Sequence, residues 1–82
     1  MYNIKFYGLS TCIHCKHAMT YLDGRGLKYD KTLVDLLDGD DYDKAVEDVR
    51  KINPNLSFPT ILVDDKHVVV GFQQEKLDEL LA

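Results

Sequence analysis

The 82-residue sequence lacks the long apolar runs of a membrane or exported protein. No stretch approaches the roughly 18 to 20 apolar residues that a membrane-spanning helix needs. From Tyr2 to Phe6 the chain alternates apolar and polar residues, where a secretory signal would have a basic start followed by an apolar block. We therefore expect a cytoplasmic protein that is not associated with a membrane.

Basic residues are also in short supply. Lys and Arg total 10 against 14 Asp and Glu, which gives a formal net charge of −4. Much of the acid lies between Asp35 and Asp48, where Lys44 is the only base. Nucleic acid is therefore not an expected partner, since its binding depends on Lys and Arg neutralising phosphates. We interpret the acidic run as a solvated loop and helix face, with a docking patch for a basic partner as the alternative.

Cysteine is limited to two residues, Cys12 and Cys15, and both belong to one C-x-x-C motif. A disulfide between them would close so short a loop that the chain-entropy model credits it with only about 2 kcal/mol of stabilisation. Disulfides in the cytosol are also usually transient rather than structural. The motif therefore favours redox exchange over a structural crosslink.

The remainder of the sequence is that of one soluble globular domain spanning residues 1–82, with 45% hydrophobic and 29% charged residues. Apolar periodicity and turn residues predict seven elements. They are strands over 2–7, 27–35, 61–63 and 67–70, and helices over 12–23, from the aspartates after Gly39 to 52, and from about 74. The order βαβαββα predicts an α/β fold, in which a parallel strand pair and an antiparallel hairpin form a four-stranded mixed sheet flanked by helices.

The predicted helix over 12–23 places the two thiols in different surroundings. Cys15 falls on the apolar stripe that should face the core, whereas Cys12 lies in the first turn, where the loop meets water. Ser10 or Thr11 is the expected N-cap of this helix. Unpaired N–H groups and the helix dipole favour a thiolate at this end. We therefore predict that Cys12 attacks a substrate and that Cys15 resolves the intermediate.

Two histidines lie close to the motif. His14, between the cysteines, would assist Cys12 if its imidazolium lay near that sulfur, and otherwise it faces solvent; both readings stay open. His17 is expected on the helix surface. Together with Cys12 and Cys15, the two histidines offer four possible metal ligands within six residues. Side chains at neighbouring positions of one helical turn point in divergent directions, however, and a structural zinc site normally brings a second pair of ligands from elsewhere in the chain. We predict no metal site, and a metal or iron–sulfur carrier using Cys12 remains a rival hypothesis.

Four features together resemble the glutaredoxin-like redoxins of the thioredoxin-fold superfamily, over nearly the whole chain. They are the strand leading into Thr11-Cys12-Ile13-His14-Cys15, the βαβαββα order, the segment Phe58-Pro59-Thr60 before the third strand, and Gly71-Phe72 after the fourth. The resemblance implies a thiol–disulfide oxidoreductase that cycles a Cys12–Cys15 disulfide, needs no bound cofactor and acts on disulfide-containing proteins. We expect it to work as a monomer.

The resemblance also implies roles for residues around the motif. The proline matching Pro59 is cis in the family and lies against the disulfide, where the backbone just before it can pair with an extended substrate. The segment matching Gly71-Phe72 borders the same groove. The implied supporting residues are Thr11, Ile13, His14 and Pro59, and the implied substrate-binding residues are Phe58, Thr60, Gly71 and Phe72.

The chain departs from the glutathione-using members of the family at the positions that hold the tripeptide. These members commonly carry a lysine three residues before the first cysteine and a Ser-Asp or Asp-Asp pair after the glycine, where this chain has Leu9 and Gln73-Gln74. The motif is most similar to the small glutaredoxin-like electron donors of ribonucleotide reductase, which thioredoxin reductase recharges. This favours a flavoprotein reductase over glutathione as the electron donor, and a glutathione-dependent glutaredoxin is the alternative.

Overall fold

A computed structural model describes residues 2–81 and contains four strands and three α-helices. The elements are β1 (Ile4–Gly8), α1 (Ile13–Gly24), β2 (Asp30–Leu33), the short 3-10 helix η1 (Val34–Leu36), α2 (Gly39–Ile52), β3 (Thr60–Val63), β4 (His67–Val70) and α3 (Gln74–Leu80). The predicted order βαβαββα is confirmed, with η1 as an addition that the periodicity did not indicate. Among the described residues, no helix combines the length and the apolar character needed to cross a membrane.

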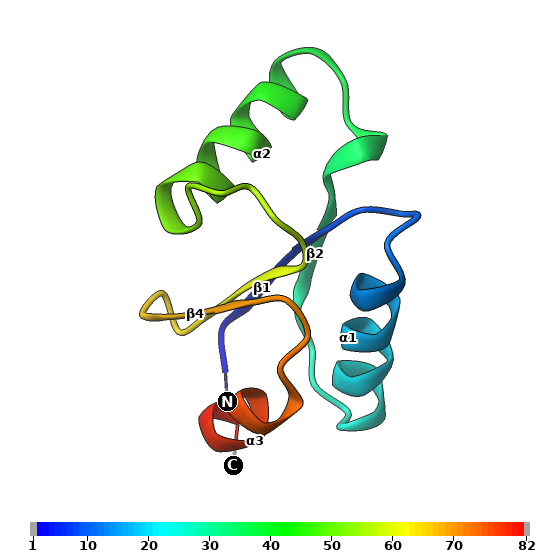
Figure 1. The fold of residues 1–82 in the computed structure, drawn as a ribbon, viewed down its shortest axis with the longest axis vertical. Helices are drawn as coiled ribbons and strands as arrows, with labels where there is room; N and C mark the ends of the chain where they lie inside the picture. The colour runs from blue at the N-terminus through cyan, green and yellow to red at the C-terminus, as the bar shows by residue number, and fades with distance from the viewer. Residues whose placement is uncertain (1, 82) are drawn as a thin grey trace.

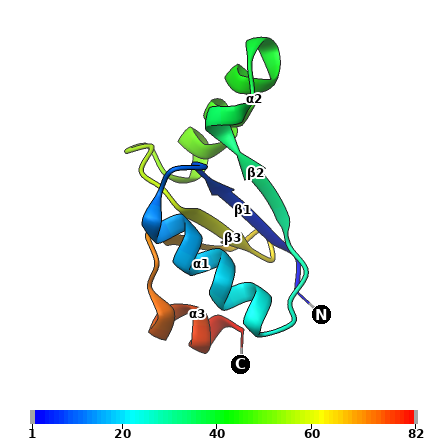
Figure 2. The ribbon, with the colours of Figure 1, turned by 90° about the vertical axis from the view of Figure 1, so that its right-hand side faces the viewer.

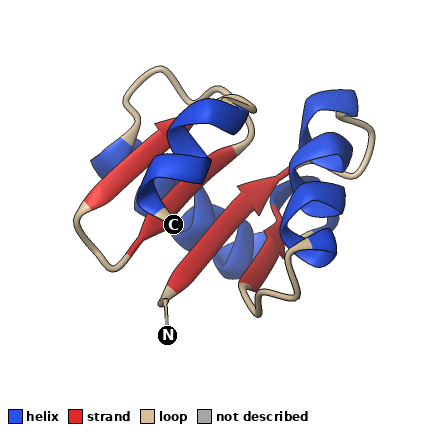
Figure 3. Ribbon diagram, turned by 90° about the horizontal axis from the view of Figure 1, so that it is seen from below, coloured by secondary structure: helices blue, strands red, loops and turns tan. Residues whose placement is uncertain are grey.

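The strands form one mixed sheet in the order β2-β1-β3-β4, and they lie side by side in Figure 3. β1 pairs with β2 in parallel, whereas β1 with β3 and β3 with β4 are antiparallel. The predicted parallel pair and hairpin are therefore both present. In the parallel pair the register aligns Gly8 with Leu33, so the strands end at the same edge of the sheet.

The second strand is shorter than predicted. The sequence indicated a strand over 27–35, but only Asp30–Leu33 is paired, and η1 begins at once after it. β2 is an edge strand whose only neighbour is β1, and β1 offers it partners from Lys5 to Gly8. The pairing therefore accounts for the C-terminal end of β2, because β1 ends at Gly8, opposite Leu33.

One face of the sheet carries the main core and is covered by α1 and α3. Figure 2 shows these two helices beside each other, with α2 at the far end of the molecule. The core cluster comprises Ile4, Phe6, Ile61, Val63 and Val69 from the strands, Cys15, Ala18 and Leu22 from α1, and Leu77 and Leu81 from the C-terminal segment. The resolving cysteine of the predicted mechanism is thus a core residue, on the inward stripe that the sequence indicated.

Helix α2 lies on the other side of the sheet (Figure 1). Tyr7 of β1 alternates with the buried residues Phe6 and Gly8, and its charged neighbours include Lys44 and Asp48 of α2. Partial burial on this face, more than any of these charges, raises the pKa of Tyr7 above its usual value. The two faces of the sheet are therefore unequal, and the cysteines belong to the better-covered one.

Candidate active site

Cys12 is the N-cap of α1. Its backbone is extended (φ −87°, ψ 119°), its Sγ accepts a hydrogen bond from the Cys15 N–H at 3.2 Å, and its carbonyl accepts one from the Lys16 N–H at 3.1 Å. The prediction that Ser10 or Thr11 caps the helix is wrong, because the cysteine sulfur itself accepts from the first turn. The Cys12 sulfur is thereby held at the N-terminal end of α1, the positive end of the helix dipole.

Cys15 is fully buried, with 0% of its surface exposed. Burial is the main reason that its pKa is raised to about 12, and a hydrogen bond with the Cys12 side chain adds to this effect. A backbone hydrogen bond from Leu9 acts in the opposite direction. The two thiols, three residues apart, therefore differ sharply in their access to solvent, since Cys12 is only half-buried.

The end of β1 approaches Cys15 closely. A Cβ added to Gly8 would lie 3.1 Å from the Cys15 Sγ and 2.6 Å from Cε1 of Phe6. Contacts this short are closer than carbon atoms tolerate, so only glycine fits without a shift of the ring or the sulfur. Gly8, the last residue of β1, thus makes room for the buried sulfur.

We expect iodoacetamide to modify the reduced native protein at Cys12 alone near pH 8. The thiolate is the reacting form, and a pKa of about 12 keeps the proton on Cys15 until the pH is far above 8. Peptide mass spectrometry of the product should find one adduct in native protein and two after unfolding in guanidinium chloride. Equal labelling of both cysteines in native protein would contradict this assignment.

The proline segment has the cis peptide bond that the resemblance implied. The Phe58-Pro59 peptide bond is cis, and Pro59 is buried. Gly71 donates its N–H to the Pro59 carbonyl at 2.8 Å and has a φ of +78°, a left-handed conformation that favours glycine. The backbone hydrogen bond therefore joins two of the predicted groove segments, although they are 12 residues apart in the sequence.

The other predicted residues divide into exposed and buried ones. Thr11 and His14 are exposed, and Ile13 is 57% exposed at the first position of α1. Phe58 is half-buried and packs against the core. Thr60 is 0% exposed, and its hydroxyl donates to the Ser57 carbonyl at 2.8 Å. The Thr60 side chain therefore forms part of the turn that precedes β3.

Asn53 was not singled out from the sequence, but it organises this same turn. It is buried, and its Nδ2 donates to the Ser57 carbonyl, the Ser57 Oγ and the Thr60 Oγ1 at 3.0, 3.2 and 3.0 Å. It also caps the end of α2 through its own N–H, which donates to Val49. An asparagine directly before the helix-stopping Pro54 was the only signal available.

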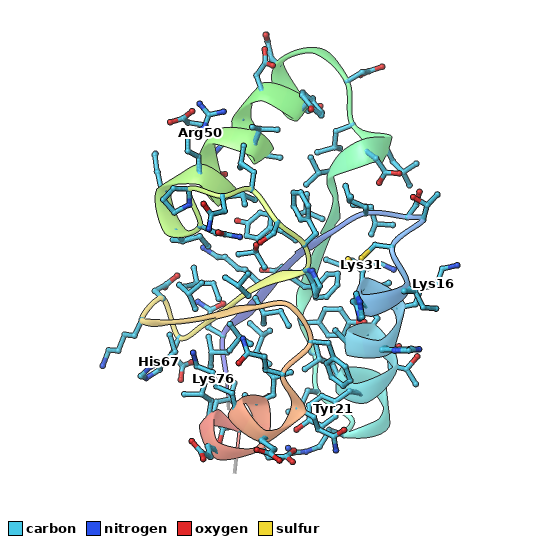
Figure 4. All side chains as sticks on the ribbon, in the orientation of Figure 1. Lys16, Tyr21, Lys31, Arg50, His67 and Lys76 are labelled. Atoms are coloured by element: carbon cyan, nitrogen blue, oxygen red, sulfur yellow. The ribbon has the colours of Figure 1, made fainter. Side chains whose placement is uncertain are left out.

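Phe72 is flanked by two aromatic rings of α1. Its centroid lies 6.4 Å from that of His17 and 5.9 Å from that of Tyr21. Tyr21 extends from α1 toward α3, where its hydroxyl donates to Asp78 (Figure 4). His17 is exposed, as predicted, but it also contacts Phe72. Lys16, by contrast, extends away from the body of the protein (Figure 4).

Within residues 2–81, no group of three or more His, Cys, Asp or Glu side chains is arranged to hold a metal ion. Cys12 and Cys15 are free thiols in this structure. The candidate site therefore comprises one half-buried and one buried thiol at a helix N-terminus, together with a cis proline whose carbonyl accepts a hydrogen bond from Gly71.

The glutaredoxin family model matches residues 4–68 of the chain. The chain belongs to the glutaredoxin family. A glutaredoxin from Methanosarcina mazei Go1 is 40% identical, with a TM-score of 0.89 over 98% of this chain and 78% of that one. The methanoredoxin of Methanosarcina acetivorans is 36% identical, with a TM-score of 0.93 over 98% and 84%. The gene 56 protein of Mycobacterium phage D29 is 33% identical over 95% of this chain and 81% of its own length.

Membership of this family confirms the resemblance drawn from the motif and the thioredoxin-like fold drawn from the element order. It also indicates thiol–disulfide oxidoreductase activity of the kind that uses redox-active cysteines without a bound cofactor. Which cysteine acts first, and which reductant restores the pair, depend on the geometry of this glutaredoxin.

Proposed function

We propose that this glutaredoxin is a dithiol oxidoreductase that reduces protein disulfides. The Cys12 thiolate attacks one sulfur of the substrate disulfide, forms a mixed disulfide and expels the first substrate thiolate. Cys15 then loses its proton and attacks the Cys12 sulfur, which expels the second substrate thiolate. The substrate gains two electrons and the protein is left with a Cys12–Cys15 disulfide.

The difference in burial between the two cysteines is the observation that carries this proposal. Cys12 is half-buried at the helix terminus, and Cys15 is fully buried, with its backbone N–H 3.2 Å from the Cys12 sulfur. A large substrate can approach the Cys12 sulfur but not the buried Cys15 sulfur. The Cys15 side chain is already hydrogen-bonded with that of Cys12. A mixed disulfide on Cys12 therefore meets an intramolecular thiol before it meets another molecule.

The cis proline segment is the proposed substrate platform. Phe58 lies just before β3, outside the paired part of the strand, and the following peptide is held by the bond from Gly71 to Pro59. An extended substrate segment would add main-chain hydrogen bonds at Phe58. Phe72, fixed against His17 and Tyr21, would form the apolar border of this platform.

A flavoprotein reductase is the proposed electron donor. In the glutathione-using members that this chain resembles, three positions hold the carboxylates and amine of glutathione. In this chain those positions are Leu9, Gln73 and Gln74. Gln73 uses its side-chain amide within the protein, donating to the Val70 carbonyl at 2.7 Å. A dianionic tripeptide would thus lose the charged partners that make its binding strong.

Turnover of a protein disulfide should be faster with thioredoxin reductase and NADPH than with glutathione and glutathione reductase. The matched variant Leu9→Lys/Gln74→Asp restores one charge of each sign, so it should lower the KM for glutathione by at least about tenfold, since even one charged hydrogen bond contributes about 1.5–3 kcal/mol. Steady-state NADPH consumption measures the turnover rate with each donor and the KM for glutathione. Efficient turnover of the unmodified protein with glutathione alone would refute the donor assignment, and no turnover with either donor would refute the oxidoreductase itself.

A further inference from the structure

Asp35 forms a two-point contact with the loop that carries Cys12. The Ser10 N–H donates to the Asp35 Oδ1 at 2.8 Å, and the Ser10 hydroxyl donates to the Oδ2 at 2.5 Å. The two residues are 25 positions apart, the same offset as the Gly8–Leu33 pair at the end of the parallel strands. The contact therefore extends the register of β1 and β2 beyond the sheet, from η1 to the active-site loop.

Ser10 follows Leu9, whose backbone carbonyl and N–H groups contact the two cysteines. The Leu9 carbonyl accepts a hydrogen bond from the Cys12 N–H at 3.2 Å, and the Leu9 backbone also bonds the Cys15 sulfur. A shift of the Leu9–Ser10 peptide would thus move the backbone of one cysteine relative to the sulfur of the other. Small displacements of reacting atoms are costly in an intramolecular reaction of this kind.

We propose that Asp35 is a positioning residue, whose carboxylate fixes the Leu9–Ser10 peptide and thereby holds Cys12 and Cys15 at the separation required for disulfide closure. This inference rests on the dithiol function proposed above. In the proposed role Asp35 acts through its hydrogen bonds with Ser10 and not by contact with either sulfur, although its charge also contributes to raising the pKa of Cys15. Formation of the Cys12–Cys15 disulfide is favoured because the held loop has fewer conformations to lose when the two reduced cysteines join.

The Asp35 side chain is suited to this task over the whole neutral range. Its hydrogen bonds with the Ser10 side chain and backbone lower the pKa of Asp35 below its usual value. A carboxyl with a lowered pKa keeps its charge, and hence both acceptor oxygens, until the pH falls below the ordinary aspartate range near 3.9. Changes in activity between pH 5 and 9 would therefore not originate at this contact.

Asp35→Ala should lower the equilibrium constant for closing the Cys12–Cys15 disulfide by roughly tenfold, the effect expected from losing charged hydrogen bonds that hold the loop. The constant is measured against oxidised and reduced dithiothreitol, with the two forms separated by mass after acid quench. Asp35→Asn retains one acceptor and should lose less, about threefold. Ser10→Ala retains the backbone N–H donor, so its equilibrium constant should lie between those of Asp35→Ala and the unmodified protein.

Asp38→Ala is the matched control for charge. Asp38 lies three residues further on at the N-cap of α2, where its side chain makes no capping hydrogen bond. Removing this carboxylate should leave the equilibrium constant within about twofold of the unmodified protein. An equal shift in Asp38→Ala and Asp35→Ala would show an effect of charge alone and would overturn the positioning role.

Thermal unfolding of each variant separates positioning from simple stabilisation. If Asp35→Ala lowers the melting temperature but leaves the equilibrium constant unchanged, the contact is structural only and the inference is wrong. Should Asp35→Ala fail to fold, Asp35→Asn and Ser10→Ala decide the same question. These outcomes are distinct from a failure of the proposed function, in which the unmodified protein would itself form no Cys12–Cys15 disulfide.

Discussion

Cys12→Ser should reduce the rate of protein-disulfide reduction to the uncatalysed background. Serine cannot form the mixed disulfide, and the buried Cys15, with a pKa of about 12, is neither accessible nor ionised near neutral pH. Turbidity of reduced insulin, or release of a chromophoric thiol, measures the loss.

Cys15→Ser should behave differently, because it leaves the first attack intact. We expect one substrate thiol to be released per protein molecule, followed by a halt at a stable adduct on Cys12. The comparison of the two serine variants provides its own control, since both remove one sulfur from the same motif. The order of the two steps would be reversed if Cys15→Ser, and not Cys12→Ser, abolished the release of the first thiol.

Phe6→Ala should lower the free energy of unfolding by about 3–5 kcal/mol, the range for removing a buried aromatic side chain from a core. Phe6 is 0% exposed in the middle of β1, and its ring meets that of Tyr29 edge-on with 5.9 Å between centroids. It also lies against the space above Gly8 that borders Cys15. Urea unfolding monitored by circular dichroism measures the change.

Leu36→Ala is the matched control for this substitution. Leu36 is 66% exposed on η1, so its truncation should change the unfolding free energy by no more than about 0.5 kcal/mol. Similar losses in both variants would contradict the assignment of Phe6 to the core. A loss below about 1 kcal/mol in Phe6→Ala would do so as well.

The fold was largely predictable because its signals are local. Apolar periodicity and turn residues marked each strand and α-helix, and the burial of Cys15 followed from its helical spacing with Leu22. The C-terminal end of β2 was not predictable in this way, because it depends on the pairing with β1, which ends at Gly8, opposite Leu33. Local propensity therefore predicted which elements exist, and tertiary pairing decided where they end.

The site was predictable where one residue type carries the chemistry. The C-x-x-C motif indicated the reacting pair, and Pro59 and Gly71 were found through the family resemblance. The N-cap was missed because a sulfur at Cys12 takes the place of the hydroxyl that helix caps usually use. The contact between Ser10 and Asp35 was missed because it depends on the register of two strands that only the structure fixes.

The position of the mixed disulfide in the unmodified protein tests the central claim most directly. Reduced protein is mixed with a disulfide peptide, quenched in acid within a single turnover, digested and mapped by mass spectrometry. We predict that the peptide is attached to Cys12 at early times and that the Cys12–Cys15 disulfide replaces this adduct. Attachment of the peptide to Cys15 at early times would contradict the account.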